Sequence, residues 1–432
     1  MCDTVWFKGN TLSIFGKNSD RNAHEAQTVE LVPQRQPKPE LSVGTLRFAL
    51  EDKGYAYCAS VPCWMDGAEM GVNEWGVAIG NEAVFSRFSR AKNGVPGMVF
   101  IKAALMSSKT AEEALQLLIT LTETQTQGGL SSYRGSLMYD NSYLICDREK
   151  AFVLETAGHC WAWKDAGDRC AISNAYSITT DFKRLDAYSR KMLAPVNPQM
   201  ACLDEADAGR IGEKSSWKTF VEQRFMNLFT RGDRRRMAVQ SALDALENCD
   251  DKTTQGQKDS ATESGGSKQD AQQKLVSKLM GILQSHNLQD TIGSSVRVCN
   301  HDRDLLGNPT TASLMVEFPA GTDDFLVWFT GASYPCANLY KPILCTHHEF
   351  IPLWTQYDYT PHAKASTLYW QYRREKLKHI LVKPAKNADN ELQKLQETVY
   401  RAAVDTLHGT ISIETARIVI RQAVEYWDTR TL

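Results

Sequence analysis

Cys2 is the residue whose type and position most clearly suggest chemistry, because removal of Met1 would place it at the N-terminus. A free α-amine has an unperturbed pKa of about 8, so at neutral pH it can act as general base toward the thiol of its own residue. A thiol with a pKa of about 8.5 needs only modest positive charge nearby to become a thiolate. Lys17 and Arg21, in the cluster KNSDR, are candidates for that charge. The alternative is an ordinary small residue near a terminus.

The residues after Cys2 predict a hairpin that would bring the polar cluster back to it. The segments VWF and TLSIF are separated by KGN, with a turn signal at Gly9 and Asn10. Residues 17–21 would then lie alongside Cys2, where Asp20 could hold the α-amine while Asn18 and Ser19 brace the loop. The alternative for Asn18 and Ser19 is a simple Asx turn that closes the hairpin.

The rest of the chain predicts an α+β layered fold. Short apolar runs such as GVAIGNEAV, YLICD, AFVLETA and CAISNAYSI read as strands, and residues 110–123 read as a helix that begins after a Thr cap. Helical patterns continue through residues 183–295 and return from 362 to 432. Between about 250 and 272 the sequence is polar and of low complexity, which predicts a disordered loop.

Composition excludes several functional classes. The 432 residues carry 49 Lys and Arg against 51 Asp and Glu, so the sequence predicts no nucleic-acid partner and no membrane partner. There is no run of about 18 apolar residues and no leader pattern, and we expect a cytosolic protein. Eleven scattered cysteines argue against a disulfide framework. No nucleotide-binding glycine motif occurs. The histidines, including His301 and the pair His347 and His348, show no metal-ligand spacing. We expect no cofactor and no metal. The sequence does not fix the oligomeric state and is compatible with a homo-oligomer.

Several motifs together resemble the secernin and dipeptidase A family of cysteine peptidases. They are MCDT, FGKNSDR with EAQ four residues later, GVNEWGVAIGNEAVF, YDNSYLICDREKAFVLETAGHCWAWK, AISNAYSI, TTASLMVEF and PCANLYKP. This family consists of N-terminal nucleophile hydrolases related to choloylglycine hydrolases and penicillin V acylases. The resemblance implies a four-layer αββα sandwich over residues 1–345, with a helical insertion at about 183–295, and a helical C-terminal extension over 346–432.

The resemblance also implies roles for particular residues. Cys2 would be the nucleophile and Asp20 would orient its amine. Asn81 and Asn174 would stabilise the oxyanion, a role in which the loss of one donor costs about a hundredfold or more. The alternative for both asparagines is turn chemistry at strand ends. The residues predicted to bind substrate are Lys17, Arg21, Asn73 and Arg297. Lys17 stands where choloylglycine hydrolases have arginine, which argues against a bile-acid substrate.

Two functions follow from these patterns. In the first, Cys2 attacks a dipeptide or another small linear amide, an acyl-enzyme forms and water releases the acid. In the second, the protein keeps the fold, as some secernin relatives do, and works as a regulatory or interaction factor with little or no peptidase activity.

Overall fold

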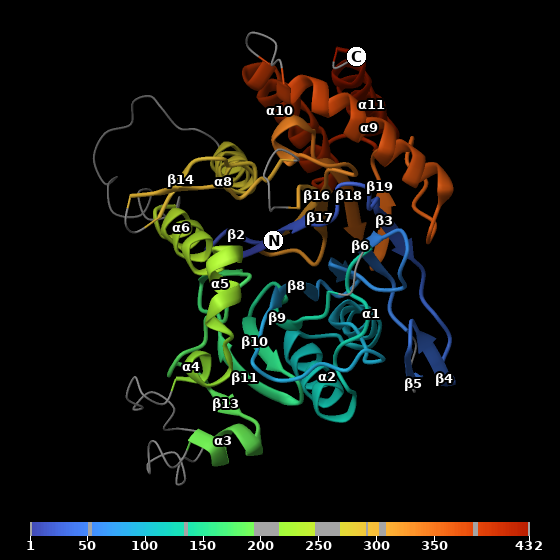
Figure 1. The fold of residues 1–432 in the computed structure, drawn as a ribbon. Coiled ribbons are helices and arrows are strands. Elements are labelled where there is room, and N and C mark those ends of the chain that lie inside the picture. The colour runs from blue at the N-terminus through green and yellow to red at the C-terminus, as the bar shows by residue number, and fades with distance from the viewer. Residues whose placement is uncertain are drawn as a thin grey trace, which may run out of the picture.

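The computed structural model describes residues 2–50, 54–133, 137–193, 216–246, 268–290, 293–301, 308–382 and 388–430. Two β-sheets lie face to face with helices on both outer sides, as Figure 1 shows. Every pairing between neighbouring strands in the described part of these sheets is antiparallel. The predicted four-layer α+β sandwich is therefore confirmed.

The first sheet has seven strands and contains the N-terminal hairpin. Its order is β12 (Arg169–Ser173), β1 (Asp3–Lys8), β2 (Leu12–Asp20), β16 (Thr310–Pro319), β17 (Phe325–Phe329), β18 (Lys341–Thr346) and β19 (Glu349–Pro352). The predicted hairpin is β1 and β2, joined through Gly9 and Asn10. Strand β1 lies second from the edge of this sheet, between β12 and β2. Strand β19 also carries this sheet past residue 345, the predicted domain boundary.

The second sheet has eight strands. Its order is β13 (Arg184–Leu185), β11 (Cys160–Asp165), β10 (Ala151–Ala157), β9 (Asp140–Cys146), β8 (Ala78–Val84), β7 (Met70–Asn73), β6 (Tyr57–Pro62) and β3 (Gln27–Val32). Apolar residues of both sheets meet in the main core between them. Two short ribbons stand apart: β4 (Lys38–Val43) with β5 (Leu46–Leu50), and β14 (Leu288–Gln289) with β15 (Ser295–Val296).

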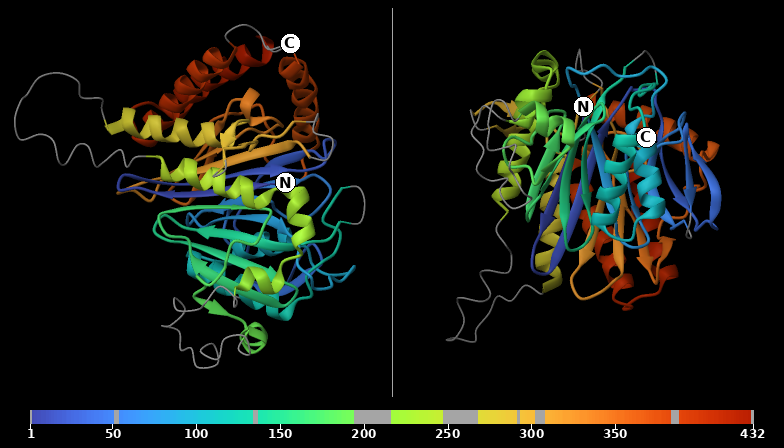
Figure 2. Two further views of the ribbon diagram at one scale, coloured as in Figure 1. Left: turned by 60° about the vertical axis from the view of Figure 1, so that its left-hand side comes forward. Right: turned by 90° about the horizontal axis from the view of Figure 1, so that it is seen from below.

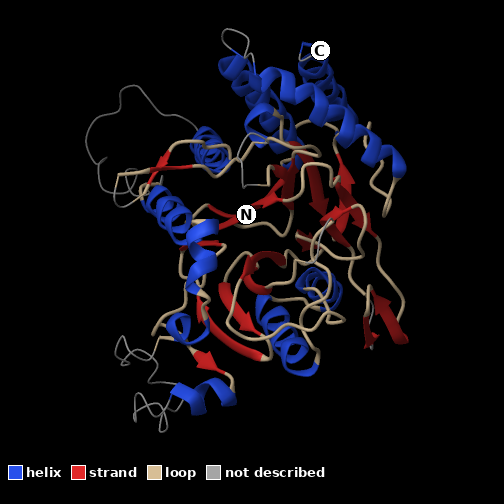
Figure 3. Cartoon of the chain, viewed as in Figure 1, coloured by secondary structure: helices blue, strands red, loops and turns tan. Residues whose placement is uncertain are grey.

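One helical layer covers the outer face of the second sheet. It consists of α1 (Gly97–Ser107) and α2 (Ala111–Thr124), which form a second apolar core with that sheet. The predicted Thr cap is present, because Thr110 Oγ1 accepts a hydrogen bond from the backbone N–H of Glu113 at 3.2 Å. Figure 3 shows how these helices and the opposite helical layer enclose the strands.

The other helical layer covers the seven-stranded sheet. It contains α8 (Lys268–Leu283), α9 (Lys364–Val382), α10 (Ala388–Leu407) and α11 (Ile413–Arg430), seen at the top of the left view in Figure 2. The predicted loop at 250–272 is wrong at its end, because α8 begins at Lys268; most of that loop lies outside the described residues. The described residues also form the helices α3 (Ala187–Leu193), α4 (Trp217–Val221), α5 (Arg224–Thr230), α6 (Gly232–Asp244) and the 3-10 turn η4 (Pro335–Ala337). Among the described residues no helix is long and apolar enough to cross a bilayer.

Candidate active site

The β1–β2 hairpin places Asp20 beside Cys2. In its register Asp3 faces Asn18, so the end of β2 returns to the start of β1. The backbone N–H of Asp20 donates a hydrogen bond to the Sγ of Cys2 at 3.3 Å. An N–H aimed at sulfur stabilises a thiolate more than a thiol, because the charged acceptor makes the stronger bond. The hairpin thus supplies the first polar partner of the thiol.

Strand β12 places Asn174 on the other side of Cys2. Asp3 is paired with Ser173, so Asn174 follows the strand at the level of Cys2. The backbone nitrogen of Cys2 donates to Asn174 Oδ1 at 2.6 Å, while Asn174 Nδ2 donates to the carbonyl of Ala83 at 2.9 Å. Asn174 is therefore fixed by the second sheet and holds the nitrogen that becomes the α-amine once Met1 is removed.

Arg235, on α6, donates hydrogen bonds to residues on both sides of this contact. Its Nη2 donates to the carbonyl oxygen of Cys2 at 2.9 Å, to Ser173 Oγ at 2.7 Å and to Asn174 Oδ1 at 2.8 Å. The close approach of α6 depends on Gly232, where a Cβ would lie 2.5 Å from the carbonyl of Asn174. The buried guanidinium thus fixes both the N-terminal residue and the asparagine that holds its nitrogen.

The carboxylate of Asp20 is held by side chains from distant parts of the chain. Thr310 Oγ1 donates to its Oδ1 at 2.6 Å, and Asn300 Nδ2 donates to its Oδ2 at 2.5 Å. Arg235 Nη1 lies 4.0 Å from Oδ2. Burial raises the pKa of this carboxyl, and these donors and the cation act in the opposite direction. The carboxylate is therefore fixed in position by its neighbours.

The thiol of Cys2 does not rest as a thiolate, contrary to the expectation from its cationic neighbours. Burial raises its pKa to about 11, although the charge of Lys17 lowers it. The Nζ of Lys17 lies 3.5 Å from Glu82 Oε1 and 4.0 Å from Glu69 Oε2, so these carboxylates offset its charge. Arg21 is likewise paired with Glu69. Desolvation outweighs the cations, and the thiol needs a base.

A cavity of about 320 Å³ opens in front of Cys2. Its wall has a polar part next to the thiol and an apolar part formed mainly by α5 and by residues near β8 and β9. The lining residues are Cys2, Asp20, Arg21, Asn22, Glu25, Glu69, Ala83, Phe85, Ser131, Ser132, Leu137, Tyr139, Asn174, Met226, Phe229, Thr230 and Asn308. Of the predicted site residues, the cavity brings together Cys2, Asp20, Asn174 and Arg21.

The other predicted site residues lie away from the cavity wall. Asn81 is buried and donates to Asn141 Oδ1 at 2.9 Å. Asn73 closes the turn after β7, where its Oδ1 accepts from the N–H groups of residues 75 and 77, both at 3.0 Å. Lys17 is fully buried between the sheets, opposite Gly80, where a Cβ would lie 2.6 Å from Lys17 Cδ. Arg297 is exposed beyond β15 and does not line the cavity.

The arginine next to the nucleophile is Arg235, a residue that the sequence reasoning missed. In the run GDRRRMAVQSALDAL, Arg235 precedes Ala238, Val239 and Leu243 by three, four and eight residues. This spacing places it on the buried stripe of an amphipathic helix, and that was the available signal. Asn300 and Thr310 were missed as well, and no local pattern marks them.

No family model matches the chain. Among solved structures, it is similar to a mutant of conjugated bile acid hydrolase from Clostridium perfringens, with a TM-score of 0.44 and 14% identity over 83% of this chain and 98% of that one. It is also similar to penicillin V acylase from Agrobacterium tumefaciens, with a TM-score of 0.41 and 10% identity over 76% and 82% of the two chains. At this level of similarity, the function has to be argued from the residues of this chain.

Proposed function

We propose that the protein is a cysteine-nucleophile amide hydrolase in which Cys2, freed by removal of Met1, attacks dipeptides or similarly small linear amides. The observation that carries this proposal is the placement of Cys2. Its thiol lines a cavity, its nitrogen is held by Asn174, and its carbonyl is held by the buried Arg235. A structural cysteine at a strand end requires none of these partners. The proposal agrees with the secernin and dipeptidase A resemblance of the N-terminal motifs.

The first chemical step is transfer of the thiol proton to the α-amine of the same residue. With a thiol pKa of about 11 and an unperturbed amine pKa of about 8, the transfer costs about 4 kcal/mol. A turnover of about 10 per second corresponds to a barrier of about 16 kcal/mol, so the proton transfer takes up only about a quarter of that barrier. The N–H of Asp20 stabilises the sulfur as it gains charge, and the Asp20 carboxylate stabilises the ammonium.

The thiolate then attacks the amide carbonyl and forms a C–S bond, which moves an electron pair onto the oxygen. Of the two predicted oxyanion donors we retain Asn174, because it lines the cavity and Asn81 does not, and because its Nδ2 carries a second N–H besides the one that donates to Ala83. The intermediate collapses by breaking the C–N bond, and the ammonium gives its proton to the leaving amine. The α-amine next takes a proton from water, which attacks the thioester, releases the acid and restores the thiol.

The charges around the cavity favour a substrate with a free amino group. With Asp20 assigned to the α-amine of the enzyme, the remaining charged lining groups are the carboxylates of Glu25 and Glu69 and the guanidinium of Arg21. Arg21 is ion-paired with both carboxylates, so these three lining groups together keep one net negative charge, which suits an ammonium better than an anionic acyl group. Phe85 and Met226 lie on the apolar part of the wall, where a small side chain can pack.

A dipeptide panel with matched variants tests the proposal. Untagged protein should hydrolyse dipeptides with free amino groups faster than their N-acetylated forms. Cys2→Ser should lower turnover by several orders of magnitude, because a hydroxyl is much harder to deprotonate, whereas Cys63→Ser away from the cavity wall should not. An uncleaved N-terminal tag should abolish turnover, because a blocked nitrogen cannot accept the proton. Full activity in the tagged protein would contradict the amine as base, and inactivity across dipeptides and acyl amides would favour the regulatory function.

A further inference from the structure

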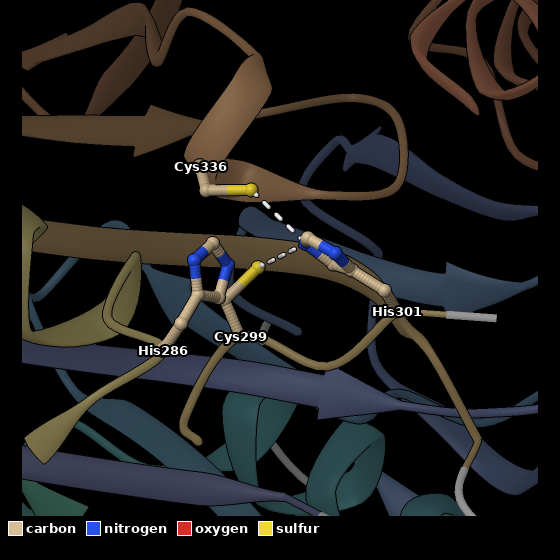
Figure 4. A group of neighbouring side chains, drawn as sticks. All are labelled: His286, Cys299, His301 and Cys336. Carbon is tan, nitrogen blue, oxygen red and sulfur yellow. Dashed lines mark hydrogen bonds between the residues drawn. The ribbon is translucent and has the colours of Figure 1, made fainter. Parts of the chain in front are cut away.

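Four side chains with metal-ligating atoms converge behind the active site. Figure 4 shows them: His286 follows α8, Cys299 and His301 lie on the segment after β15, and Cys336 lies in η4. One ligand atom from each residue lies within 4.8 Å of the corresponding atom in the other three. Cys299 is buried and the others are half-buried. Three separate loops therefore bring two thiols and two imidazoles to one point.

The spacing of these atoms suits a tetrahedral ion. Ligand atoms at zinc–nitrogen and zinc–sulfur bond lengths of about 2.0–2.3 Å, at tetrahedral angles, lie about 3.3–3.8 Å from one another. His301 Nε2 lies 3.2 Å from Cys336 Sγ and 3.8 Å from Cys299 Sγ. All four ligand atoms lie within 4.8 Å of one another, so a side-chain movement of about 1 Å brings the widest pair to the spacing of a tetrahedral site.

His286 provides a second, independent observation. Its Nε2 is buried and has no hydrogen-bond partner among the residues that the structure describes. A buried polar atom without a partner costs about 1–3 kcal/mol, so an arrangement that keeps one usually has a use for it. The imidazole rings of His286 and His301 lie edge to face with centroids 4.6 Å apart, beside the two sulfur atoms.

The backbone already holds the three loops together. The carbonyl of Ser285, next to His286, accepts hydrogen bonds from the N–H groups of Val298 at 2.9 Å and Cys299 at 3.0 Å. Gln284 Nε2 donates to the carbonyl of Pro335, next to Cys336, at 3.0 Å. The ligands therefore start from a preorganised framework, which reduces the cost of assembling a site on binding.

We propose that His286, Cys299, His301 and Cys336 bind one Zn²⁺ ion in a closed, structural site. Two thiolates and two neutral imidazoles neutralise a divalent cation, and four protein ligands leave no open position for a substrate or an activated water. Binding releases the two thiol protons to solvent as the two sulfur–zinc bonds form. The competing arrangement, a Cys299–Cys336 disulfide, leaves His286 Nε2 without a partner and gives the histidines no role. The proposal departs from the sequence expectation of no metal.

The ion would also act on the active site through Asn300, which lies between two ligands in sequence. Asn300 donates to Asp20 Oδ2, and its backbone N–H donates to Thr310 Oγ1 at 2.9 Å, the second partner of Asp20. Zinc at Cys299 and His301 would fix the segment that carries this positioning residue. This consequence rests on the proposed function, whereas the site itself does not.

The decisive experiment measures zinc in untagged wild-type protein by elemental mass spectrometry after gel filtration. We expect about one zinc per chain, a strong loss in Cys336→Ser and in His286→Ala, and full retention in Cys63→Ser and His24→Ala, which remove a cysteine and a histidine elsewhere. Replacement by Co²⁺ should give the visible absorption of a tetrahedral thiolate site.

Measurements on the wild-type protein alone can overturn the proposal. The test therefore does not depend on whether the variants fold. Protein with far less than one zinc per chain, no cobalt spectrum after incubation with excess Co²⁺, or a Cys299–Cys336 disulfide under non-reducing peptide mapping would each contradict it. Equal zinc loss in the cluster variants and the control variants would show an adventitious ion. These readouts do not use activity, so a failed hydrolase assay leaves them unaffected.

Discussion

Replacement of Arg235 by methionine removes the buried cation that connects the N-terminal residue to its surroundings. The guanidinium donates three hydrogen bonds from Nη2, and its Nε lies 3.4 Å from Asp3 Oδ1. Methionine has a similar length but no donor, so the carbonyl of Cys2 keeps only the hydrogen bond from Ser173 Oγ at 3.1 Å, and the buried carboxylate of Asp3 loses its cation. Loss of one partner of a buried charged pair typically costs about 3–5 kcal/mol of stability.

This cost should depend on pH, because Asp3 can become neutral. Burial already raises its pKa to about 6, against the lowering effect of Arg235. A carboxyl whose pKa is raised by folding binds more protons in the folded state, so its contribution to stability falls as pH rises toward the folded pKa. Without Arg235 the pKa of Asp3 rises further, and that window extends upward. If the pKa of Asp3 rises by about two units, the variant loses more unfolding free energy relative to wild type at pH 8 than at pH 5. The difference between the two losses is about 2–3 kcal/mol.

Urea unfolding at these two pH values, followed by intrinsic fluorescence, measures the effect. Arg234→Met is the matched control, because Arg234 lies on the same helix but pairs with Asp290 through contacts of 2.6 and 2.7 Å, away from Cys2. We expect its cost to differ much less between the two pH values, because the backbone N–H of Ser294 still donates to Asp290 Oδ1 at 2.7 Å and keeps that carboxylate ionised. In a dipeptidase assay Arg235→Met should lose at least about tenfold in kcat with a smaller change in KM, because Asn174 loses its orientation. A pH-independent cost or unchanged kcat in Arg235→Met would refute the reasoning.

Three further predictions concern the pH dependence and the asparagines. Asp20→Asn removes the negative charge that stabilises the ammonium, so the amine pKa should fall and the ascending limb of kcat/KM should move to lower pH, at a reduced plateau; an unmoved limb would contradict this role. Glu317 accepts hydrogen bonds from Tyr400 at 2.9 Å and Trp328 at 3.0 Å, and burial raises its pKa from 4.5 to about 7. The contribution of Glu317 to stability therefore falls as pH rises through this range. The unfolding free energy of Glu317→Gln, measured in urea, should increase relative to that of wild type by up to about 3 kcal/mol between pH 4 and pH 8. Asn174→Ala should lower kcat by about a hundredfold or more, whereas Asn81→Ala should act mainly on stability through its bond to Asn141, and the reverse order would restore Asn81 as the oxyanion donor.

The parts of the fold that follow from local patterns were predictable. The turn at Gly9 and Asn10 predicted the hairpin, and the hairpin alone brings Asp20 to Cys2. The Thr cap at residue 110 predicted the start of α2. The layer order and Asn174 came from the resemblance, because pairing between β1 and β12 joins residues about 170 positions apart and leaves no local trace.

The contacts around Asp20 could not be predicted for the same reason. Asn300 and Thr310 reach Asp20 only because β16 pairs with β2, and that pairing depends on the apolar faces of whole strands. The His286 and Cys336 cluster draws its ligands from three loops with no common spacing, so no motif search finds it. Arg235 is a different case. The spacing of apolar residues in its helix predicts that its side chain is buried, but it does not predict which distant residues the side chain contacts.

Covalent capture of the nucleophile tests the central claim most directly. Untagged protein is mixed with an aminoacyl p-nitrophenyl ester, quenched in acid within the first turnovers, and analysed by intact mass and peptide mapping. We predict one aminoacyl group per chain, bound as a thioester to a peptide that begins at Cys2 and lacks Met1, and no adduct in Cys2→Ala. An acyl group on another residue, or turnover of the ester without any adduct at Cys2 and undiminished in Cys2→Ala, would contradict it.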